Sequence, residues 1–243
     1  MELTVLGRNG PYPEPGGACS GYLVRGGETT VLLDCGAGTV SRLREACPLD
    51  RLDAILLSHL HYDHCSDLGV LRYLLEQIAA RDGMRQPMPV YAPDAPAHAR
   101  ELLDYPVFDV RPIADGMRVK IGSLAVTFHE MAHPVPTFGM DIVDGDGKRL
   151  FYTGDTGWFS GLAGLCRGAD ALLCDTCFLD ADDHGQPLVH LTARQAGVLA
   201  KEARVGRLLC THLWGGENRD KSVQKEVDIS DACVVQERGT YVI

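Results

Sequence analysis

Apolar and polar positions along the first half of the chain follow two periods, which predict strands and helices in succession. Three short apolar runs near the N-terminus predict strands, joined by turns that include Gly26-Gly27. Apolar residues then recur at helical spacing from Leu68 to Ile78, so that helix has a face that can pack on a sheet. The expected elements are strands near 2–7, 20–25 and 30–34, a helix near 38–47, a strand at 53–58 and a helix at 67–80.

The second half of the chain is again rich in predicted strands. Two of them form a hairpin, 138–144 and 148–153, around a turn of alternating Asp and Gly. A helix is predicted from Thr192, because Thr192 and Gln195 have the spacing of a capping box. The other expected strands lie near 88–92, 107–111, 117–121, 124–131 and 172–174, and a strand at 207–211 closes the pattern.

Two β-rich halves with their helices predict an α+β fold in which two sheets pack face to face. Helices then cover the outside, which gives a four-layer αββα sandwich. The chain contains no low-complexity stretch, repeat or obvious linker. We therefore expect residues 1–243 to form one domain.

Composition and charge narrow the classes of function. A content of 45% hydrophobic and 23% charged residues is typical of a globular protein. The net charge of −10 opposes loose binding to nucleic acid or to an anionic membrane, because both need clustered Lys and Arg. No apolar run approaches the ~18 residues that cross a bilayer, and no signal-peptide pattern precedes the first strand. The sequence predicts a cytoplasmic protein without membrane contact.

Nine cysteines are scattered through the chain, several of them in apolar runs. This distribution favours reduced thiols in a cytosolic core over a disulfide framework. Cys174 and Cys177 have the Cys-x-x-Cys spacing of some redox and zinc sites, but no second pair and no thioredoxin-like flank accompanies them. The spacing alone assigns them no function.

The strongest chemical signal is the segment His-Leu-His-Tyr-Asp-His at residues 59–64, which directly follows an apolar strand. It holds three of the nine histidines of the chain, which a polar loop with chance histidines would not explain. In an extended segment, residues two apart point the same way, so His59 and His61 can share one metal ion. The turn after them then presents Asp63 and His64 to another ion.

This segment matches the H-x-H-x-D-H signature of the metallo-β-lactamase superfamily, which the sequence resembles over nearly its whole length. Further matching residues follow in the order of the family, and these are Asp34, His133, Asp155 and His212. The resemblance implies two metal ions bridged by Asp155, with Asp34 fixing ligand histidines through hydrogen bonds. The implied ligands are His59, His61 and His133 for one ion, and Asp63, His64 and His212 for the other.

Within that superfamily, the sequence is similar to the ribonuclease Z-like branch. Residues 175–178 and 190–196 resemble its E-x-T-F and H-x-T-A-x-Q-A segments. The resemblance implies that His190, oriented by Asp175, acts as a general acid or an electrostatic clamp on the leaving group. The branch usually has Glu at position 175, so the shorter Asp has less reach toward His190.

Two departures from that branch bear on the substrate. Ribonuclease Z carries an arm that grips transfer RNA, inserted between the positions of His133 and Asp155, yet only 21 residues separate them here. The segment after His212 also lacks the S-R-Y-type continuation of that enzyme, and the chain is acidic. We therefore expect no binding of transfer RNA. The opening strand and the loop after it resemble armless phosphodiesterases, which act on cyclic or simple nucleotide phosphodiesters.

These similarities predict a dinuclear metal-dependent hydrolase that acts on a small phosphodiester. Mixed imidazole and carboxylate ligands suit two zinc ions first, and manganese or iron also fit such a site. A hydroxide shared by the two ions is the expected nucleophile. The expected catalytic residues are His190, Asp175 and Asp63. Dimers are common among similar proteins, so a homodimer also fits the resemblance.

Other classes of protein share parts of this pattern. Glyoxalase II-like relatives cleave thioesters or lactones with the same ligands, but the segments of Asp175 and His190 favour a phosphodiester. An iron redox role, as in flavodiiron proteins, lacks its flavodoxin-like domain, and a non-catalytic scaffold would have lost ligands. Trp158 and Phe159 are expected in the pocket or in the core. The histidines without a partner motif, expected at the surface or in strands, are His98, His129 and His184.

Overall fold

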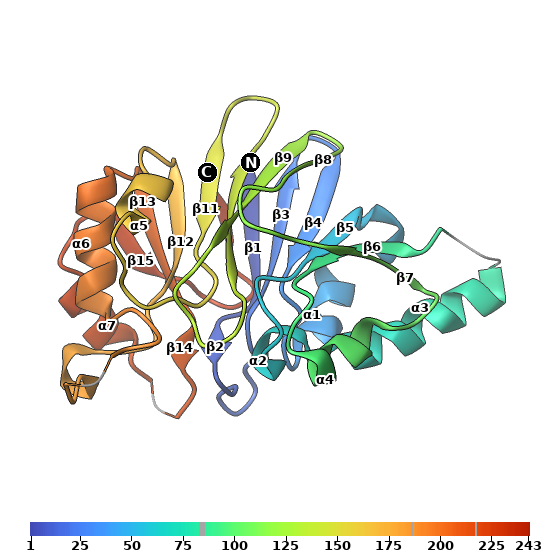
Figure 1. Ribbon diagram of the computed structural model, residues 1–243, viewed down its shortest axis with the longest axis horizontal. Coiled ribbons are helices and arrows are strands. Elements are labelled where there is room, and N and C mark those ends of the chain that lie inside the picture. The colour runs from blue at the N-terminus through green and yellow to red at the C-terminus, as the bar shows by residue number, and fades with distance from the viewer. Residues whose placement is uncertain (83–85, 186, 217) are drawn as a thin grey trace.

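The structure is a computed structural model that describes residues 1–82, 86–185, 187–216 and 218–243. Within these residues, two seven-stranded sheets pack face to face and helices cover both outer faces (Figure 1). The predicted α+β fold, a four-layer αββα sandwich, is confirmed. A separate two-stranded ribbon of β2 (Asn9–Gly10) and β14 (Leu213–Trp214) joins the two halves of the chain at the lower edge in Figure 1.

The first sheet is built mainly from the N-terminal half. Its antiparallel strands β1, β3 and β4 are followed by the parallel strands β5, β6 and β7. All five residues of β4 are buried, as expected for a strand that is covered on both faces. In spatial order its strands are β16 (Thr240–Val242), β1 (Glu2–Gly7), β3 (Gly21–Gly26), β4 (Thr29–Leu33), β5 (Ala54–Leu56), β6 (Met88–Ala92) and β7 (Phe108–Pro112).

The second sheet comes from the C-terminal half and is also mixed. The strands from β8 to β11 form an antiparallel meander, whereas β12, β13 and β15 add in parallel. The predicted hairpin is β10 and β11, and it fills the sequence between His133 and Asp155, so no arm projects from that segment. In spatial order the strands are β15 (Ala232–Val234), β13 (Arg207–Thr211), β12 (Ala171–Asp175), β11 (Arg149–Tyr152), β10 (Phe138–Val143), β9 (Leu124–Glu130) and β8 (Arg118–Ile121).

Helices on the two outer faces and side chains between the sheets complete the layers. The layer between the sheets is closed by large buried residues such as Tyr22, Phe128 and Tyr152. The predicted capping box is confirmed, because Thr192 Oγ1 accepts from the amide of Gln195 at 3.1 Å and the Gln195 side chain accepts from Thr192 at 3.0 Å. The first sheet carries α1 (Thr39–Ala46), α3 (Leu68–Asp82) and α4 (Ala97–Arg100), and the second α5 (Leu162–Leu165), α6 (Ala193–Ala203) and α7 (Asp220–Val227) (Figure 1).

Two expectations about the chain pattern were wrong. The strand at 207–211 does not close it, because α7, β15 and β16 follow, and β16 pairs with β1. These late strands have three residues each and are only partly buried, so they carry little apolar periodicity. The expected turn after His61 is instead the short helix α2 (Tyr62–Cys65). No helix in the described ranges is long and apolar enough to cross a bilayer.

Candidate metal centre

The candidate ligands lie at the lower edge of the sandwich in Figure 1, where strands of both sheets end. Asp34 directly follows β4, and His59 comes three residues after β5. From the other sheet, Asp155 follows β11 and His212 follows β13. The candidate residues therefore come from the ends of strands in both halves of the chain.

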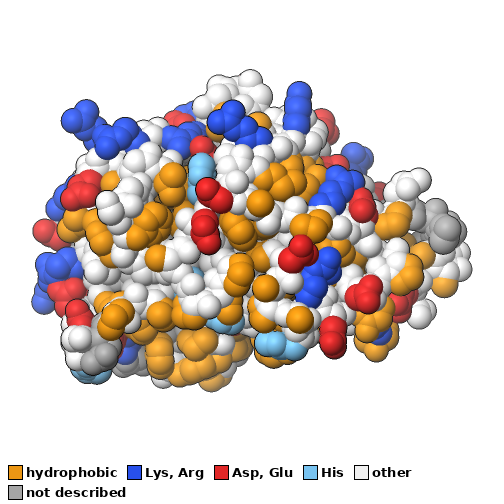
Figure 2. Space-filling model, viewed as in Figure 1, with side chains coloured by type: hydrophobic (Ala, Val, Ile, Leu, Met, Phe, Trp, Pro, Cys, Tyr) orange, Lys and Arg blue, Asp and Glu red, His pale blue; other side chains and the backbone are white. Residues whose placement is uncertain are grey.

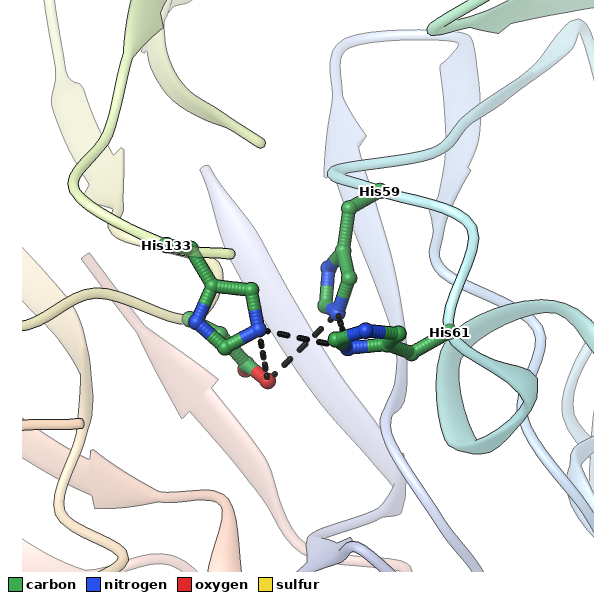
Figure 3. A group of neighbouring side chains, drawn as sticks. His59, His61 and His133 are labelled. Carbon is green, nitrogen blue, oxygen red and sulfur yellow. Dashed lines mark hydrogen bonds and ion pairs between the residues drawn. The ribbon is translucent and has the colours of Figure 1, made fainter. Parts of the chain in front are cut away.

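One cluster consists of His59, His61, His133 and Asp155, whose ligand-type atoms all lie within 4.8 Å of one another. Figure 3 shows the three imidazoles pointing toward one another from two separate segments of the chain. His61 Nδ1 lies 3.0 Å from His59 Nε2 and 3.2 Å from His133 Nε2. Asp155 Oδ2 lies 3.5 Å from the first of these Nε2 atoms and 3.9 Å from the second.

A second cluster consists of Asp63, His64, Asp155 and His212, and all four residues are buried. His212 Nε2 lies 3.2 Å from Asp63 Oδ2 and 3.3 Å from Asp155 Oδ2. His64 Nε2 lies 3.3 Å from the other oxygen of Asp155. The two clusters share Asp155, so the structure brings together all seven expected ligands in the expected two sets. Their role as ligands stays a prediction.

The donor atoms of both clusters fit divalent cations. Ligands about 2.0–2.2 Å from a tetrahedral zinc ion lie roughly 3.3–3.6 Å from one another, which is close to the separations here. Three buried atoms of these residues have no hydrogen-bond partner among the residues that the structure describes, namely His64 Nε2, Asp155 Oδ1 and His212 Nδ1. Buried polar atoms rarely lack a hydrogen-bond partner. Two of these atoms, His64 Nε2 and Asp155 Oδ1, face each other across the cluster.

Hydrogen bonds behind the clusters fix which nitrogen faces inward in His59, His64 and His133. His64 Nδ1 donates to Asp34 at 2.8 Å, and His133 Nδ1 donates to the carbonyl of Val189 at 3.0 Å. The Ser58 hydroxyl donates to Asp34 at 2.8 Å and so accepts from His59 Nδ1 at 3.0 Å. In each case the Nε2 lone pair is left for a cation, as is usual for histidines that bind metals.

Asp34 anchors this outer layer and belongs neither to the two clusters nor to the described lining of the cleft. Its Oδ2 accepts from His64, from Ser58 and, at 2.6 Å, from the hydroxyl of Tyr152, while its Oδ1 accepts from the Ser58 amide at 2.7 Å. The residue is fully buried and has a left-handed backbone with φ of 56°. The structure therefore places Asp34 where the sequence analysis expected it, behind the ligand histidines.

Burial and charge set the protonation of the ligand residues. Burial lowers the pKa of His59, His61 and His133, so these imidazoles are neutral and able to bind a cation. Burial alone would raise the pKa of Asp63 and Asp155, but the neighbouring histidines hold both pKa values below the usual range. Both carboxylates are therefore ionised at neutral pH.

His190 and Asp175 form a pair at the edge of the clusters. Asp175 ends β12, and its Oδ2 accepts from His190 Nδ1 at 2.8 Å, so the shorter carboxylate does reach the imidazole. Asp175 also accepts from the backbone amides of Thr156 and Cys177 at 3.2 Å and 3.0 Å. Burial disfavours the charged imidazole of His190, but the Asp175 carboxylate outweighs it and raises the pKa to about 9. His190 is therefore cationic at neutral pH.

A cleft of about 430 Å³ opens over the clusters. Among the described residues that line it there is no lysine or arginine, and neither Trp158 nor Phe159 belongs to them. Phe159 packs against the core beneath α6, and Trp158 is 41% exposed. The lining residues are Pro11, His61, Tyr62, Asp63, His133, Pro134, Asp155, Val189, His190 and His212.

The three histidines without a motif lie apart from the ligand clusters. His129 is in β9, with its ring 6.0 Å from that of Phe151, and His184 is exposed. His98 is in α4, where its ring lies 6.2 Å from that of Tyr62. A larger hollow of about 630 Å³ lies between α1 and α3, and none of the metal-type clusters found in the described residues lies there.

The sequence analysis missed several residues of the site. The hydroxyl groups of Ser58 and Tyr152 donate hydrogen bonds to Asp34. In the sequence, they are marked only by the place of Ser58 beside the ligand segment and of Tyr152 inside an apolar strand. Cys177 has its sulfur within 4.8 Å of ligand-type nitrogens of His190 and His212. Gly10 was missed entirely, although a side chain there would overlap the imidazole of His212.

Comparison with known proteins gives one consistent match. The sequence matches the Beta-lactamase superfamily domain over residues 29–213. It is 34% identical over 215 residues to the probable metallo-hydrolase YhfI of Bacillus subtilis, which covers 88% of this chain and 87% of that protein. The crystal structure of YhfI aligns with a TM-score of 0.91 at 29% identity, covering 99% of this chain and 98% of that chain.

Two mycobacterial proteins are similar over most of their length. An uncharacterized protein of Mycobacterium tuberculosis is 36% identical over 236 residues, which cover 93% of this chain and 85% of that protein. The ribonuclease Z of Mycobacterium avium is 31% identical over 241 residues, which cover 87% of this chain and 85% of that protein.

Replacing Gly10 by alanine is expected to lower the affinity for zinc at least about tenfold, because the added methyl group displaces His212. Zinc affinity is measured by competition with a chromophoric chelator. Gly145→Ala is the matched control, since a side chain at that turn position meets nothing within 4 Å. Equal zinc affinity in Gly10→Ala and the native chain would contradict the assignment of His212.

Asp34→Asn is expected to lower zinc affinity by about 10- to 100-fold, because an amide cannot accept all four hydrogen bonds that the carboxylate accepts. The same titration measures this. Asp53→Asn is the control, because Asp53 is exposed and accepts from the Thr30 amide in another part of the first sheet. A native zinc affinity in Asp34→Asn would show that the outer layer does not orient His64.

Proposed function

The chain belongs to the beta-lactamase superfamily, and from that premise we propose that it is a dinuclear metal-dependent hydrolase of small or cyclic nucleotide phosphodiesters. The observation that carries the proposal is the pairing of two ligand clusters through Asp155, directly beside the charged pair of His190 and Asp175. The similarity to a ribonuclease Z, a name that denotes cleavage of RNA, supports the phosphodiester class.

The residues of the two clusters would hold two divalent ions, with zinc as the first expectation and manganese or iron as alternatives. When bound, such ions polarise the phosphoryl group and make water more acidic. His59, His61 and His133 are neutral and the aspartates are ionised, as this binding requires, whereas His64, whose pKa the neighbouring carboxylates raise, would give up its proton when the ion binds. Asp63 and Asp155 balance the charge of the cations within the protein.

His190 is proposed to donate the proton that the leaving oxygen needs. Its Nδ1 is engaged by Asp175, so Nε2 is the atom left to face a substrate. An alkoxide is a poor leaving group unless it is protonated or paired with a cation. A cationic imidazole can supply the proton or the positive charge. A thiolate leaves without such help, which favours an ester with an alkoxide leaving group over a thioester.

The size of the cleft supports a small substrate. Its volume of about 430 Å³ lies in the range of ordinary small-molecule sites. The hairpin of β10 and β11 stands where an RNA-gripping arm would be inserted, and the net charge is −10. We therefore propose a nucleotide-sized phosphodiester and not transfer RNA as the substrate.

The zinc- or manganese-loaded protein is expected to hydrolyse bis(p-nitrophenyl) phosphate and at least one cyclic nucleotide. Release of p-nitrophenolate and chromatography of the nucleotide measure the two reactions. His61→Ala is expected to abolish both, because it removes a ligand of one cluster. His184→Ala, at an exposed position away from the cleft, is the control. Cleavage of lactones or thioesters without any diester would contradict the proposal and favour the glyoxalase II-like class.

His190→Ala is expected to lower kcat about 10²- to 10⁴-fold on a diester with an aliphatic leaving group, with little change in KM. The loss should be much smaller with p-nitrophenolate, which leaves without a proton. Asp175→Asn should also lower kcat more with the aliphatic leaving group than with p-nitrophenolate, but by a smaller factor than His190→Ala. Asp175→Glu should retain activity because a carboxylate still faces His190. An equal loss for both leaving groups would rule out proton donation by His190.

A further inference from the structure

Apolar side chains at the mouth of the cleft are exposed. Tyr62 and Val189 line it and are 56% and 38% exposed, although large apolar side chains are usually covered. Tyr12, which follows the lining residue Pro11, is 45% exposed. Figure 2 shows hydrophobic and histidine side chains together along the lower edge of the molecule, where β2, β14 and α2 lie in Figure 1.

Beside the cleft, three aromatic rings lie next to one another in a row, which we call the aromatic wall and define as Tyr12, Phe178 and Trp214. The ring centroids of Tyr12 and Trp214 are 6.0 Å apart, and those of Phe178 and Trp214 are 6.5 Å apart. Phe178 also meets His190 edge to face, with centroids 5.3 Å apart. The aromatic wall therefore runs from His190, which lines the cleft, to Tyr12, which is 45% exposed, and its three rings stand outside the described lining of the cleft.

The aromatic wall is fixed to the metal centre by the backbone. Trp214 is two residues beyond His212, and its strand β14 pairs with β2, so that Trp214 lies opposite Gly10 and next to the segment of Tyr12. A side chain at Gly216 would collide with the indole nitrogen of Trp214 and the hydroxyl of Tyr12. Close approach of the two rings depends on this glycine.

The charge around the cleft limits what the aromatic wall can bind. Among the described lining residues no lysine or arginine is present to pair with a second phosphate. The Arg219 guanidinium lies 5.8 Å from the Trp214 ring centroid, but it is paired with Asp182. A terminal phosphate on the substrate would meet apolar rings in a protein that already carries net negative charge.

We propose that the aromatic wall is the subsite for the leaving group, and that it binds an uncharged planar ring such as a nucleobase. This inference rests on the proposed phosphodiesterase function. When the phosphorus–oxygen bond breaks, the leaving oxygen takes its proton from His190, so the group attached to that oxygen lies beside His190. Phe178 is the neighbour of His190 there, and Trp214 and Tyr12 extend the contact.

The first test measures binding without turnover. The chain has two tryptophans, so Trp158→Phe leaves Trp214 as the only one. Adenosine 5′-monophosphate is titrated into this zinc-loaded variant, with ribose 5-phosphate as the probe that lacks the ring. Quenching by the nucleotide, with about 5- to 100-fold tighter binding than the sugar phosphate, is expected from a stacked base. Equal affinities without quenching would overturn the proposal.

The second test uses matched variants and calorimetry. Trp214→Leu is expected to remove the preference for the nucleotide over ribose 5-phosphate, while Trp158→Leu keeps it. Tyr12→Leu, at an exposed side chain with little effect on folding, is expected to reduce the preference and keeps the test valid if Trp214→Leu does not fold. An unchanged preference in Tyr12→Leu, or in a folded Trp214→Leu, would overturn the subsite.

Failure of the subsite and failure of the proposed function give different results. Quenching and ring-dependent affinity in a protein that cleaves no diester would support the aromatic wall and contradict the phosphodiesterase. Cleavage of bis(p-nitrophenyl) phosphate with no ring-dependent affinity would do the reverse. Tighter binding of adenosine 5′-diphosphate than of the monophosphate would contradict the inference that the cleft has no place for a second phosphate.

Discussion

Three buried carboxylates at one edge of the sandwich are the constraint on which the site depends. Asp34, Asp63 and Asp155 are at most 9% exposed, and negative charge in such a place is costly unless positive charge balances it. The protein supplies part of that charge itself. Burial disfavours a charged His64, but these three carboxylates raise its pKa well above the usual value. A metal ion and a proton thus compete for the same position, and the cluster is built to hold a cation of one kind or the other.

The ends of strands hold these charged side chains in position. The candidate ligands lie after β5, between β9 and β10, and after β11 and β13, so both sheets contribute and each ion would connect the two halves of the sandwich. Ser58 and Asp34 then set the orientation of His59 and His64. Because strand ends and buried hydrogen bonds move little, the donor atoms are arranged before a cation arrives, which reduces the entropic cost of binding.

The sequence carried enough information for the layers and for which candidate ligands lie together, and less for what surrounds them. Strong apolar periodicity predicted the core strands, and the compact segment at 59–64 marked the site. The pairing of β16 with β1 escaped because three-residue strands have almost no period. Gly10 and Tyr152 act only through neighbours that are distant in sequence, and the aromatic wall joins residues from three separate segments, so local patterns could not reveal them. Whether Asp175 reaches His190 could not be predicted from the sequence. The Asp side chain is one methylene group shorter than Glu, and its distance to His190 depends on where β12 ends.

The candidate ligands come from both sheets, and this affects the order of events while the chain is being synthesised. His59 and His61 emerge from the ribosome early, but Asp155 and His212 follow only after most of the second sheet has been made. N-terminal segments begin to fold first during translation, so a nascent chain passes through a stage with exposed ligands and no complete cavity for an ion. Capture of an ion by the two clusters would therefore come at the end of folding, after most of the second sheet has formed.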